Sequence, residues 1–127
     1  MNYIPDTHTF IWFLNGDKNI SVKARKAIEA SGAANFISIA SLWEIAIKIS
    51  LGRLELKIPF EQLADEIAAS GFQILPVTFS DIATLSALPF HHSDPFDRLL
   101  IAQGINSGFT IISKDSHFTS YPAKILW

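Results

Sequence analysis

The sequence predicts a single α/β domain spanning residues 1–127. Helix and strand signals alternate along its whole length, and no linker, repeat or low-complexity tract separates them. A length of 127 residues is typical of one domain, and a hydrophobic content of 49%, with ten Phe and three Trp, is enough for one packed core. We therefore expect the chain to fold alone as one α/β unit.

In the first half of the chain, capping residues mark the expected helix ends. Asn15-Gly16 closes an apolar helical segment, Ser21 is a good N-cap, and Gly32 is placed as a C-terminal stop. The next helix has a broad apolar face and ends at Gly52. The elements expected here are strands at Asn2–Pro5 and Asn35–Ser38, and helices at Thr7–Leu14, at Val22–Ala30 and between the second strand and Gly52.

In the second half, prolines mark most of the expected helix ends. Pro59 can start a helix, Pro89 stops one before a loop over Phe90–Ser93, and Asp94-Pro95 opens another that Gly108 ends. The elements expected here are helices at Phe60–Ser70, near Ser80–Leu88 and at Phe96–Asn106, and strands at Phe72–Val77, at Phe109–Ser113 and, along an edge, at Lys124–Trp127.

Composition excludes several classes of protein. The absence of Cys removes disulfides, thiolate zinc sites and cysteine nucleophiles, so a cytoplasmic protein is the simplest interpretation. A net charge of −2 and a pI near 6.0 argue against non-specific coating of nucleic acid. Charged residues interrupt the apolar stretches before the roughly 18 residues that span a bilayer, so we expect no membrane segment, and the first residues do not resemble a signal peptide.

Four acidic residues are expected at one edge of the sheet. Right-handed crossovers bring the carboxyl ends of parallel strands together with the amino ends of the following helices, where open α/β folds bind ligands. Asp6 ends the first strand, and Glu44 lies early in the helix after the second. Asp97 begins the helix before the fourth strand, and Asp115 follows that strand. Their carboxylates are therefore expected to face one cleft.

Carboxylates placed so close together need a counter-charge. Two of them about 4 Å apart repel by roughly 4 kcal/mol at an effective dielectric constant of about 20, so the cluster must protonate, bind a cation or lose stability. Oxygen ligands alone select a hard cation such as Mg²⁺ or Mn²⁺, which leaves positions open for waters and phosphate oxygens. The chemistry predicted is metal-assisted hydrolysis of a phosphodiester bond.

Each acid also has a structural interpretation. Glu44 stands three residues after Ser41, as in a capping box, and four residues before Lys48, as in an i,i+4 ion pair. Asp6 and Asp115 both suit turns. Only the shared position of the acids at one sheet edge favours a functional role.

Four segments around these acids resemble the PIN-domain ribonucleases, specifically the VapC-type toxins of toxin–antitoxin pairs. The segments are Asp6-Thr7-His8, residues 38–48 (SIASLWEIAIK), residues 94–103 (DPFDRLLIAQ) and Ser113-Lys114-Asp115. The match runs in the expected order from near residue 3 to near residue 121. The two long segments are specific to the family.

The resemblance implies an α/β/α sandwich with a short, mainly parallel central sheet and an Mg²⁺- or Mn²⁺-dependent endoribonuclease. It also implies a homodimer and an antitoxin that blocks the site. It places the core acids at Asp6, Glu44 and Asp97, and a fourth, more variable acid at Asp115. Asp6 and Asp97 are the preferred direct metal ligands, Glu44 is a ligand or orients water beside the metal, and Asp115 supports the ligands or a second ion.

Asp94 is an extra acid close to the third family position. In the family the acid is followed directly by Arg and an apolar run, which here is Asp97-Arg98-Leu99-Leu100. We therefore expect Asp94 to cap the helix that Pro95 begins and Asp97 to be the functional acid. The helix dipole also favours an acid at the position of Asp97, so a purely structural role is the alternative.

Other residue types near the acids are expected to be structural. Adjacent histidines are poor chelators of one ion, so a solvated loop position is expected for His91, His92 and His117. Amphipathic helices favour a core position for Trp12 and Trp43 over a role as platforms on which RNA bases stack. Contacts with RNA phosphates and solvated or ion-paired positions are equally compatible with Lys48, Arg53, Arg98 and Lys114.

Two rival functions remain open. A phosphoacceptor receiver domain has a similar length and an acidic Mg²⁺ pocket. It is expected to have two adjacent acids after the first strand and a Lys-Pro late in the chain. In this sequence Asp6 is a single acid, and Lys114 is followed by Asp115. The second rival is a catalytically inert PIN-like domain that only binds protein, which the presence of all four acids disfavours. No motif specifies the RNA target.

Overall fold

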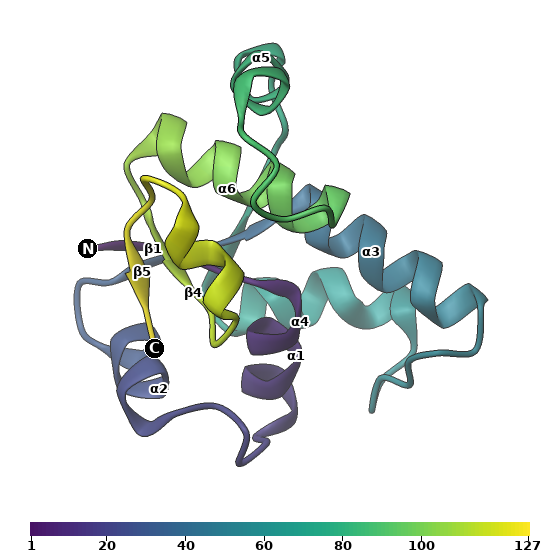
Figure 1. Cartoon of the computed structure of the whole chain (residues 1–127). Coiled ribbons are helices and arrows are strands. Elements are labelled where there is room, and N and C mark those ends of the chain that lie inside the picture. Colours follow the sequence, from purple (N-terminus) through teal and green to yellow (C-terminus); the bar gives the residue numbers. More distant parts are fainter.

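A five-stranded parallel sheet lies between two helical layers in the computed structural model, which describes all 127 residues (Figure 1). The strands are β1 (Asn2–Pro5), β2 (Ala34–Ser38), β3 (Phe72–Leu75), β4 (Thr110–Ile112) and β5 (Ile125–Leu126). Their order is β3-β2-β1-β4-β5, and every neighbouring pair is parallel. The expected α/β/α sandwich is confirmed, with a sheet that is entirely parallel.

Helices provide the connections between the first four strands. They are α1 (Thr7–Asn15), α2 (Val22–Glu29), α3 (Ile39–Ser50), α4 (Leu63–Ala69), α5 (Phe79–Ala87) and α6 (Pro95–Ser107). Two short 3-10 turns, η1 (Phe60–Gln62) and η2 (Ser116–Ser120), precede α4 and β5. No helix combines the length and the apolar character needed to cross a membrane.

Local capping chemistry sets several of the helix ends, as the sequence predicts. Ser21 and Asp94 are N-caps whose side chains accept from backbone N–H groups, and Gly16 and Gly108 end their helices with positive φ angles of 63° and 73°. The predicted start of a helix at Phe60 is wrong. Pro59 is followed by the 3-10 turn η1, and α4 begins only at Leu63.

The end of β3 and the segment between β4 and β5 also differ from expectation. Strand β3 ends at Leu75, two residues before the predicted end, because Pro76 has no N–H to continue the ladder. The 3-10 turn η2 has no counterpart among the predicted elements. The edge strand at the C-terminal end is confirmed, although it contains only Ile125–Leu126.

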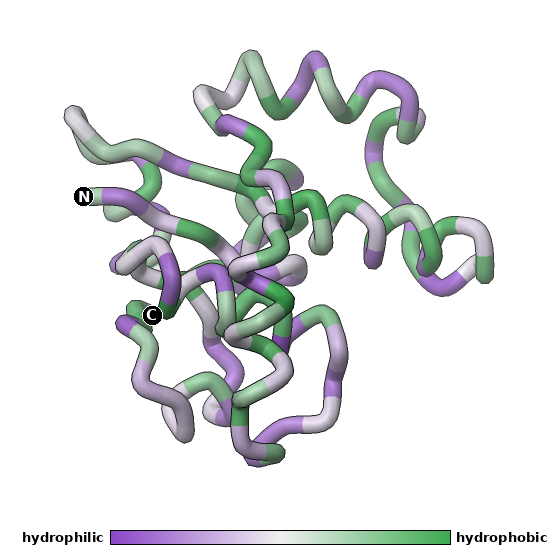
Figure 2. The backbone as a smooth tube through the Cα atoms, turned by 90° about the horizontal axis from the view of Figure 1, so that it is seen from above, coloured by the Kyte–Doolittle hydropathy of each residue, from purple (hydrophilic) through white to green (hydrophobic).

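Two hydrophobic clusters cover opposite faces of the sheet. On one face, Phe10 of α1, Ile28 of α2 and Ile67 of α4 pack with strand residues. On the other, Ile101 of α6 and Phe118 of η2 pack with further strand residues. Figure 2 shows hydrophobic and hydrophilic residues alternating along the outer helices, as burial of only one helix face requires.

The strand order determines where a ligand site can form. Connections from β1 run to β2 on one side, and the chain later returns to β4 on the other side of β1. This reversal leaves a crevice at the carboxyl ends of β1 and β4, which is where open α/β sheets bind ligands. The backbone N–H of Asp6 donates to the carbonyl of Ile112 at 2.9 Å, so these two strand ends are held side by side.

A buried glutamine joins the two helices that border this crevice. Ser38, the N-cap of α3, donates through its hydroxyl to Gln103 Oε1 at 2.5 Å. Gln103 lies on α6 and donates through Nε2 to the carbonyl of Pro76 at 3.2 Å. Both Ser38 and Gln103 are buried, so water cannot replace these bonds. The link fixes the start of α3 against the middle of α6.

We expect Gln103→Leu to lower the free energy of unfolding by about 1–3 kcal/mol, because it leaves the Ser38 hydroxyl and the Pro76 carbonyl without their partner. Chemical denaturation measures this change. Gln73→Leu is the control, since Gln73 is exposed on β3. Equal stabilities for the two variants would show that the Gln103 link contributes nothing.

Candidate active site

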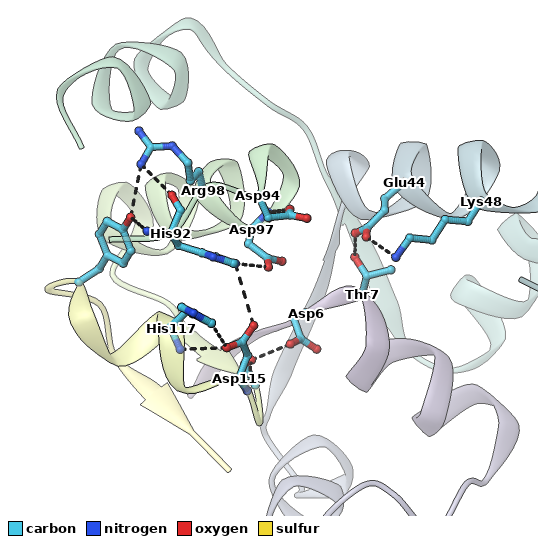
Figure 3. A network of polar contacts seen from close by, with 12 residues as sticks. Asp6, Thr7, Glu44, Lys48, His92, Asp94, Asp97, Arg98, Asp115 and His117 are labelled. Carbon is cyan, nitrogen blue, oxygen red and sulfur yellow. Dashed lines mark hydrogen bonds and ion pairs between the residues drawn. The ribbon is translucent and has the colours of Figure 1, made fainter. Parts of the chain in front are cut away.

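A pocket of about 360 Å³ lies at the carboxyl ends of β1 and β4. All four predicted acids line it, together with a fifth carboxylate and two lysines. Its lining residues are Asp6, Thr7, His8, Trp12, Glu44, Lys48, Asp94, Asp97, Lys114 and Asp115. Figure 3 shows that the four predicted acids come from segments far apart in the sequence and point toward one region.

Asp6 is held rigidly at the base of the pocket. Its Oδ1 accepts from the backbone N–H of Thr9 at 2.9 Å and so caps α1. Its Oδ2 accepts from the Ser113 hydroxyl at 2.6 Å, which ties it to the end of β4. Each carboxylate oxygen has a second lone pair, so both remain able to bind a cation.

Glu44 projects from α3 into the pocket and is buried. The Thr7 hydroxyl donates to Oε1 at 2.6 Å, and Lys48 Nζ lies 2.8 Å from Oε2. The predicted i,i+4 ion pair is therefore confirmed. The predicted capping box with Ser41 is wrong, because α3 begins earlier, with Ser38 as its N-cap.

Asp97 stands in the first turn of α6 and carries the most perturbed acid group. Its backbone N–H donates to Asp94 Oδ1 at 2.9 Å, so Asp94 is the N-cap, as predicted. Burial raises the pKa of Asp97 from 3.8 to about 6, and the negative charges of Asp94 and Asp6 act in the same direction. The hydrogen bond with His92 only partly opposes this shift.

His92 belongs to the site, and the expectation of a solvated loop position is wrong for this residue. Its Nε2 lies 2.7 Å from Asp97 Oδ2 and 4.0 Å from Asp115 Oδ2, and only 14% of the side chain is exposed. The backbone N–H of His92 donates to the Tyr121 hydroxyl at 2.9 Å. His91, by contrast, is exposed.

Arg98 is buried and does not contact the pocket, so it is not available for RNA phosphates. Its guanidinium donates to backbone carbonyls and to the Tyr121 hydroxyl, and it lies 3.9 Å from the centre of the Phe90 ring. The carbonyl acceptors are those of Leu85, Leu88, Pro89 and His92. Arg98 therefore anchors the loop that presents His92.

The other three basic residues differ in position. Lys48 is paired with Glu44, Lys114 is exposed at the pocket wall, and Arg53 is exposed outside the pocket. Only Lys48 and Lys114 are therefore placed to meet a ligand in this pocket.

Asp115 lies at the outer side of the pocket with His117. Burial alone would raise the pKa of Asp115. Hydrogen bonds from the backbone N–H and the ring of His117 outweigh this effect and hold the pKa of Asp115 below its usual value. His92, Asp115 and His117 form the only group of three or more His, Asp or Glu side chains whose ligand atoms all lie within 4.8 Å of one another. The four predicted acids therefore share a pocket without closing around one point.

The two tryptophans expected in the core occupy different positions. Trp43 is 61% exposed and contacts Phe96 edge-on, with 5.2 Å between the ring centres, so the core expectation is wrong for it. Trp12 is half-buried against the core and also reaches the pocket.

The donor set fits a hard divalent cation. Carboxylate oxygens are the ligands that Mg²⁺ and Mn²⁺ prefer. The raised pKa of Asp97 shows that its negative charge is poorly compensated, which a cation would relieve. Asp6 and Asp97 suit direct contact best, because Glu44 is already paired with the positive charge of Lys48, whereas the groups that donate to Asp6 are uncharged.

Comparisons with known proteins agree with the predicted family. The profile of the PIN domain matches residues 3–124. A protein from Mycobacterium tuberculosis, Ribonuclease VapC22, is 31% identical over 121 residues, covering 91% of this chain and 88% of that protein.

Solved structures share the fold. The chain resembles one chain of VapBC2 from Rickettsia felis bound to a promoter DNA fragment, with a TM-score of 0.74, 16% identity and coverage of 99% of this chain and 98% of that one. It also resembles a chain of a toxin-antitoxin complex from Klebsiella pneumoniae, with a TM-score of 0.66, 18% identity and coverage of 98% and 96%. At these identities the likeness is one of fold.

We expect Asp97→Asn to raise the melting temperature of the metal-free protein at pH 8, with the difference vanishing near pH 4. The folded-state pKa of Asp97, about 6, is above the usual 3.8, so the folded protein binds this proton more tightly and loses stability as pH rises through this range. Thermal melts of Asp97→Asn and the wild type in EDTA, between pH 4 and pH 8, measure the effect.

The neighbouring acid Asp94 is the control for this measurement. Asp94→Ala removes a helix cap and should cost about 1 kcal/mol of stability at pH 8. A stability difference between Asp97→Asn and the wild type that stayed constant with pH would contradict the assigned pKa.

Proposed function

Because the chain belongs to the PIN domain family, we propose that it is a metal-dependent endoribonuclease that acts as the toxin of a toxin–antitoxin pair. The observation that carries the proposal is the convergence of Asp6, Glu44, Asp97 and Asp115 in one pocket at the point where the strand order reverses. The relative of 31% identity is named a ribonuclease, which supports this interpretation of the pocket.

In this proposal Asp6 and Asp97 hold Mg²⁺ or Mn²⁺. A divalent cation held there would supply charge stabilisation to the phosphodiester. In the hydrolysis, the water oxygen bonds to phosphorus, one P–O ester bond breaks, and a proton from the water ends on the leaving oxygen. Ser113 and the N-terminus of α1 keep Asp6 in position, and His92 keeps Asp97 in position. Glu44 orients water in the pocket, and Asp115 supports the ligands from the opposite wall.

The two lysines give the acidic pocket its affinity for a phosphate backbone. Lys48 is 35% exposed and is held over the pocket by its ion pair with Glu44. Lys114 directly follows Ser113 and is exposed at the pocket wall. Both lysines reach phosphates on either side of the bond that is cut, as point charges without base specificity.

The alternatives are less well supported. A phosphoacceptor receiver domain has no support, because the family profile that matches residues 3–124 is that of the PIN domain. A catalytically inert PIN-like domain is less well supported, because all four acids line one pocket and the relative of 31% identity is named a ribonuclease. The cleavage assay below separates the inert domain from the nuclease.

We expect the purified protein to cut a mixed RNA pool internally with Mg²⁺ or Mn²⁺ and not with EDTA, as seen by mapping of the cleavage ends. Asp6→Asn and Asp97→Asn should each lower the rate by orders of magnitude, because the cation loses a charged ligand. Asp94→Ala should keep most of the activity, since it removes only a helix cap. An inactive Asp94→Ala beside an active Asp97→Asn would move the third catalytic acid to Asp94.

An antitoxin is the second part of the proposal. The pocket contains five carboxylates against two lysines, so a partner segment bearing Arg or Lys is complementary to it. The structural neighbour from Klebsiella pneumoniae is part of a toxin-antitoxin complex, which supports a partner of this kind. Such a segment would block access of RNA to the acids.

A homodimer is the third part. A groove beside the pocket has only apolar lining residues, and Trp43, at 61% exposure, is the most exposed of them. The lining residues are Ile39, Ala40, Trp43, Val77, Ile82 and Leu99. A second copy that covered this groove would bury an apolar surface otherwise open to water.

We expect the wild type to be a dimer by light scattering at micromolar concentrations and Trp43→Glu to be a folded monomer, because a charge in the groove would be buried without a partner. Phe79→Glu is the control, since Phe79 is 85% exposed and lies outside the groove. A monomeric wild type, or a dimeric Trp43→Glu, would contradict this interface.

A further inference from the structure

Trp12 is the single apolar residue among the ten that line the acidic pocket. It lies on α1, and Asp6 caps that helix, so the indole and the base of the pocket belong to one rigid element. Trp12 follows Asp6 by six positions, which corresponds to about 9 Å along a helix axis. The aromatic ring is therefore fixed at a short distance from the acids.

Two aromatic rings neighbour Trp12, and neither is parallel to its indole. His8, one helical turn earlier, is tilted by 42° with 5.9 Å between ring centres, and Trp127 is tilted by 59° at 6.1 Å. Neither ring is parallel to the indole, so neither stacks on its face. Trp12 is half-buried and keeps a surface toward the pocket.

The same pocket contains the groups that meet a phosphate backbone. Lys48 and Lys114 line it together with the acids, and its volume of about 360 Å³ is near the lower limit for small-molecule sites, about 300 Å³. That space suits one nucleotide unit rather than a double helix. A base that is paired within a helix is already stacked on both faces and cannot present a face to the indole.

We propose that Trp12 is a nucleobase-binding subsite, which stacks one unpaired base of a single-stranded RNA segment next to the phosphate that is cut. Every base has an aromatic face, so such stacking selects single-stranded over duplex RNA with little preference for sequence. The inference rests on the ribonuclease activity proposed above and adds a base-binding residue to that site.

The experiment combines variants of Trp12 with three forms of one RNA, one intact and two abasic. A single-stranded oligonucleotide containing the mapped cleavage site is made intact and with an abasic ribose at each nucleotide flanking the cut. Values of kcat and KM in Mg²⁺ are measured for the wild type, Trp12→Leu, Trp12→Phe and Phe60→Leu. Phe60 is the matched control, an exposed aromatic residue outside the pocket.

The wild type should cleave one of the abasic RNAs with a kcat/KM about 5- to 140-fold lower, mainly through KM. This range is a stacking energy of about 1–3 kcal/mol converted at 1.4 kcal/mol per factor of ten. Trp12→Leu should cleave the intact and abasic RNAs equally, and Trp12→Phe should keep part of the difference. Phe60→Leu should behave as the wild type does.

A purely structural role for Trp12 gives a different result. Trp12→Leu would then lower kcat/KM by the same factor for the intact and the abasic RNAs. It would still prefer the intact RNA as strongly as the wild type does, which would overturn the subsite. A wild type indifferent to both abasic positions would overturn it as well. A wild type that cleaved no RNA would instead overturn the proposed function, and the subsite with it.

Discussion

The carboxylates at one end of the sheet repel one another, and the neighbouring residues of the site reduce this repulsion. Parallel strands and their crossovers bring the acids into one pocket, and each has neighbours that offset part of its charge. Ser113 donates to Asp6, and Lys48 pairs with Glu44. Asp97 is the exception, because burial and two nearby acids raise its pKa to about 6 despite the hydrogen bond with His92. A divalent cation is the group that would relieve this remaining cost.

Helix α6 contributes both the perturbed acid and the bonds that hold it in place. Gln103 connects the middle of the helix to the start of α3, and Arg98 connects its first turns to the loop that presents His92. Buried polar groups need partners, so replacing either residue would disturb the position of Asp97 as well as the stability of the fold. A substitution far from the substrate can therefore change activity by moving the acid.

Much of the fold and all four acids could be predicted from the sequence, because the signals are local or follow from chain order. Caps such as Ser21 and Asp94 act within one turn, and parallel crossovers determine which strand ends meet. His92 could not be placed, since its position depends on Tyr121, 29 residues later in the chain. Trp43 was misplaced because helical periodicity shows that a face is apolar without showing whether that face meets the core or solvent.

In the proposed function, a cation held by Asp6 and Asp97 compensates the buried negative charge of Asp97 and makes this pocket a catalytic site. Anomalous diffraction from crystals of the wild type grown with Mn²⁺ tests it most directly, because the ion is located without reference to activity. We expect a Mn²⁺ peak within bonding distance, about 2 Å, of carboxylate oxygens of Asp6 and Asp97. A peak confined to His92, Asp115 and His117, the only compact group of potential ligands in the protein, or no peak in the pocket, would contradict it.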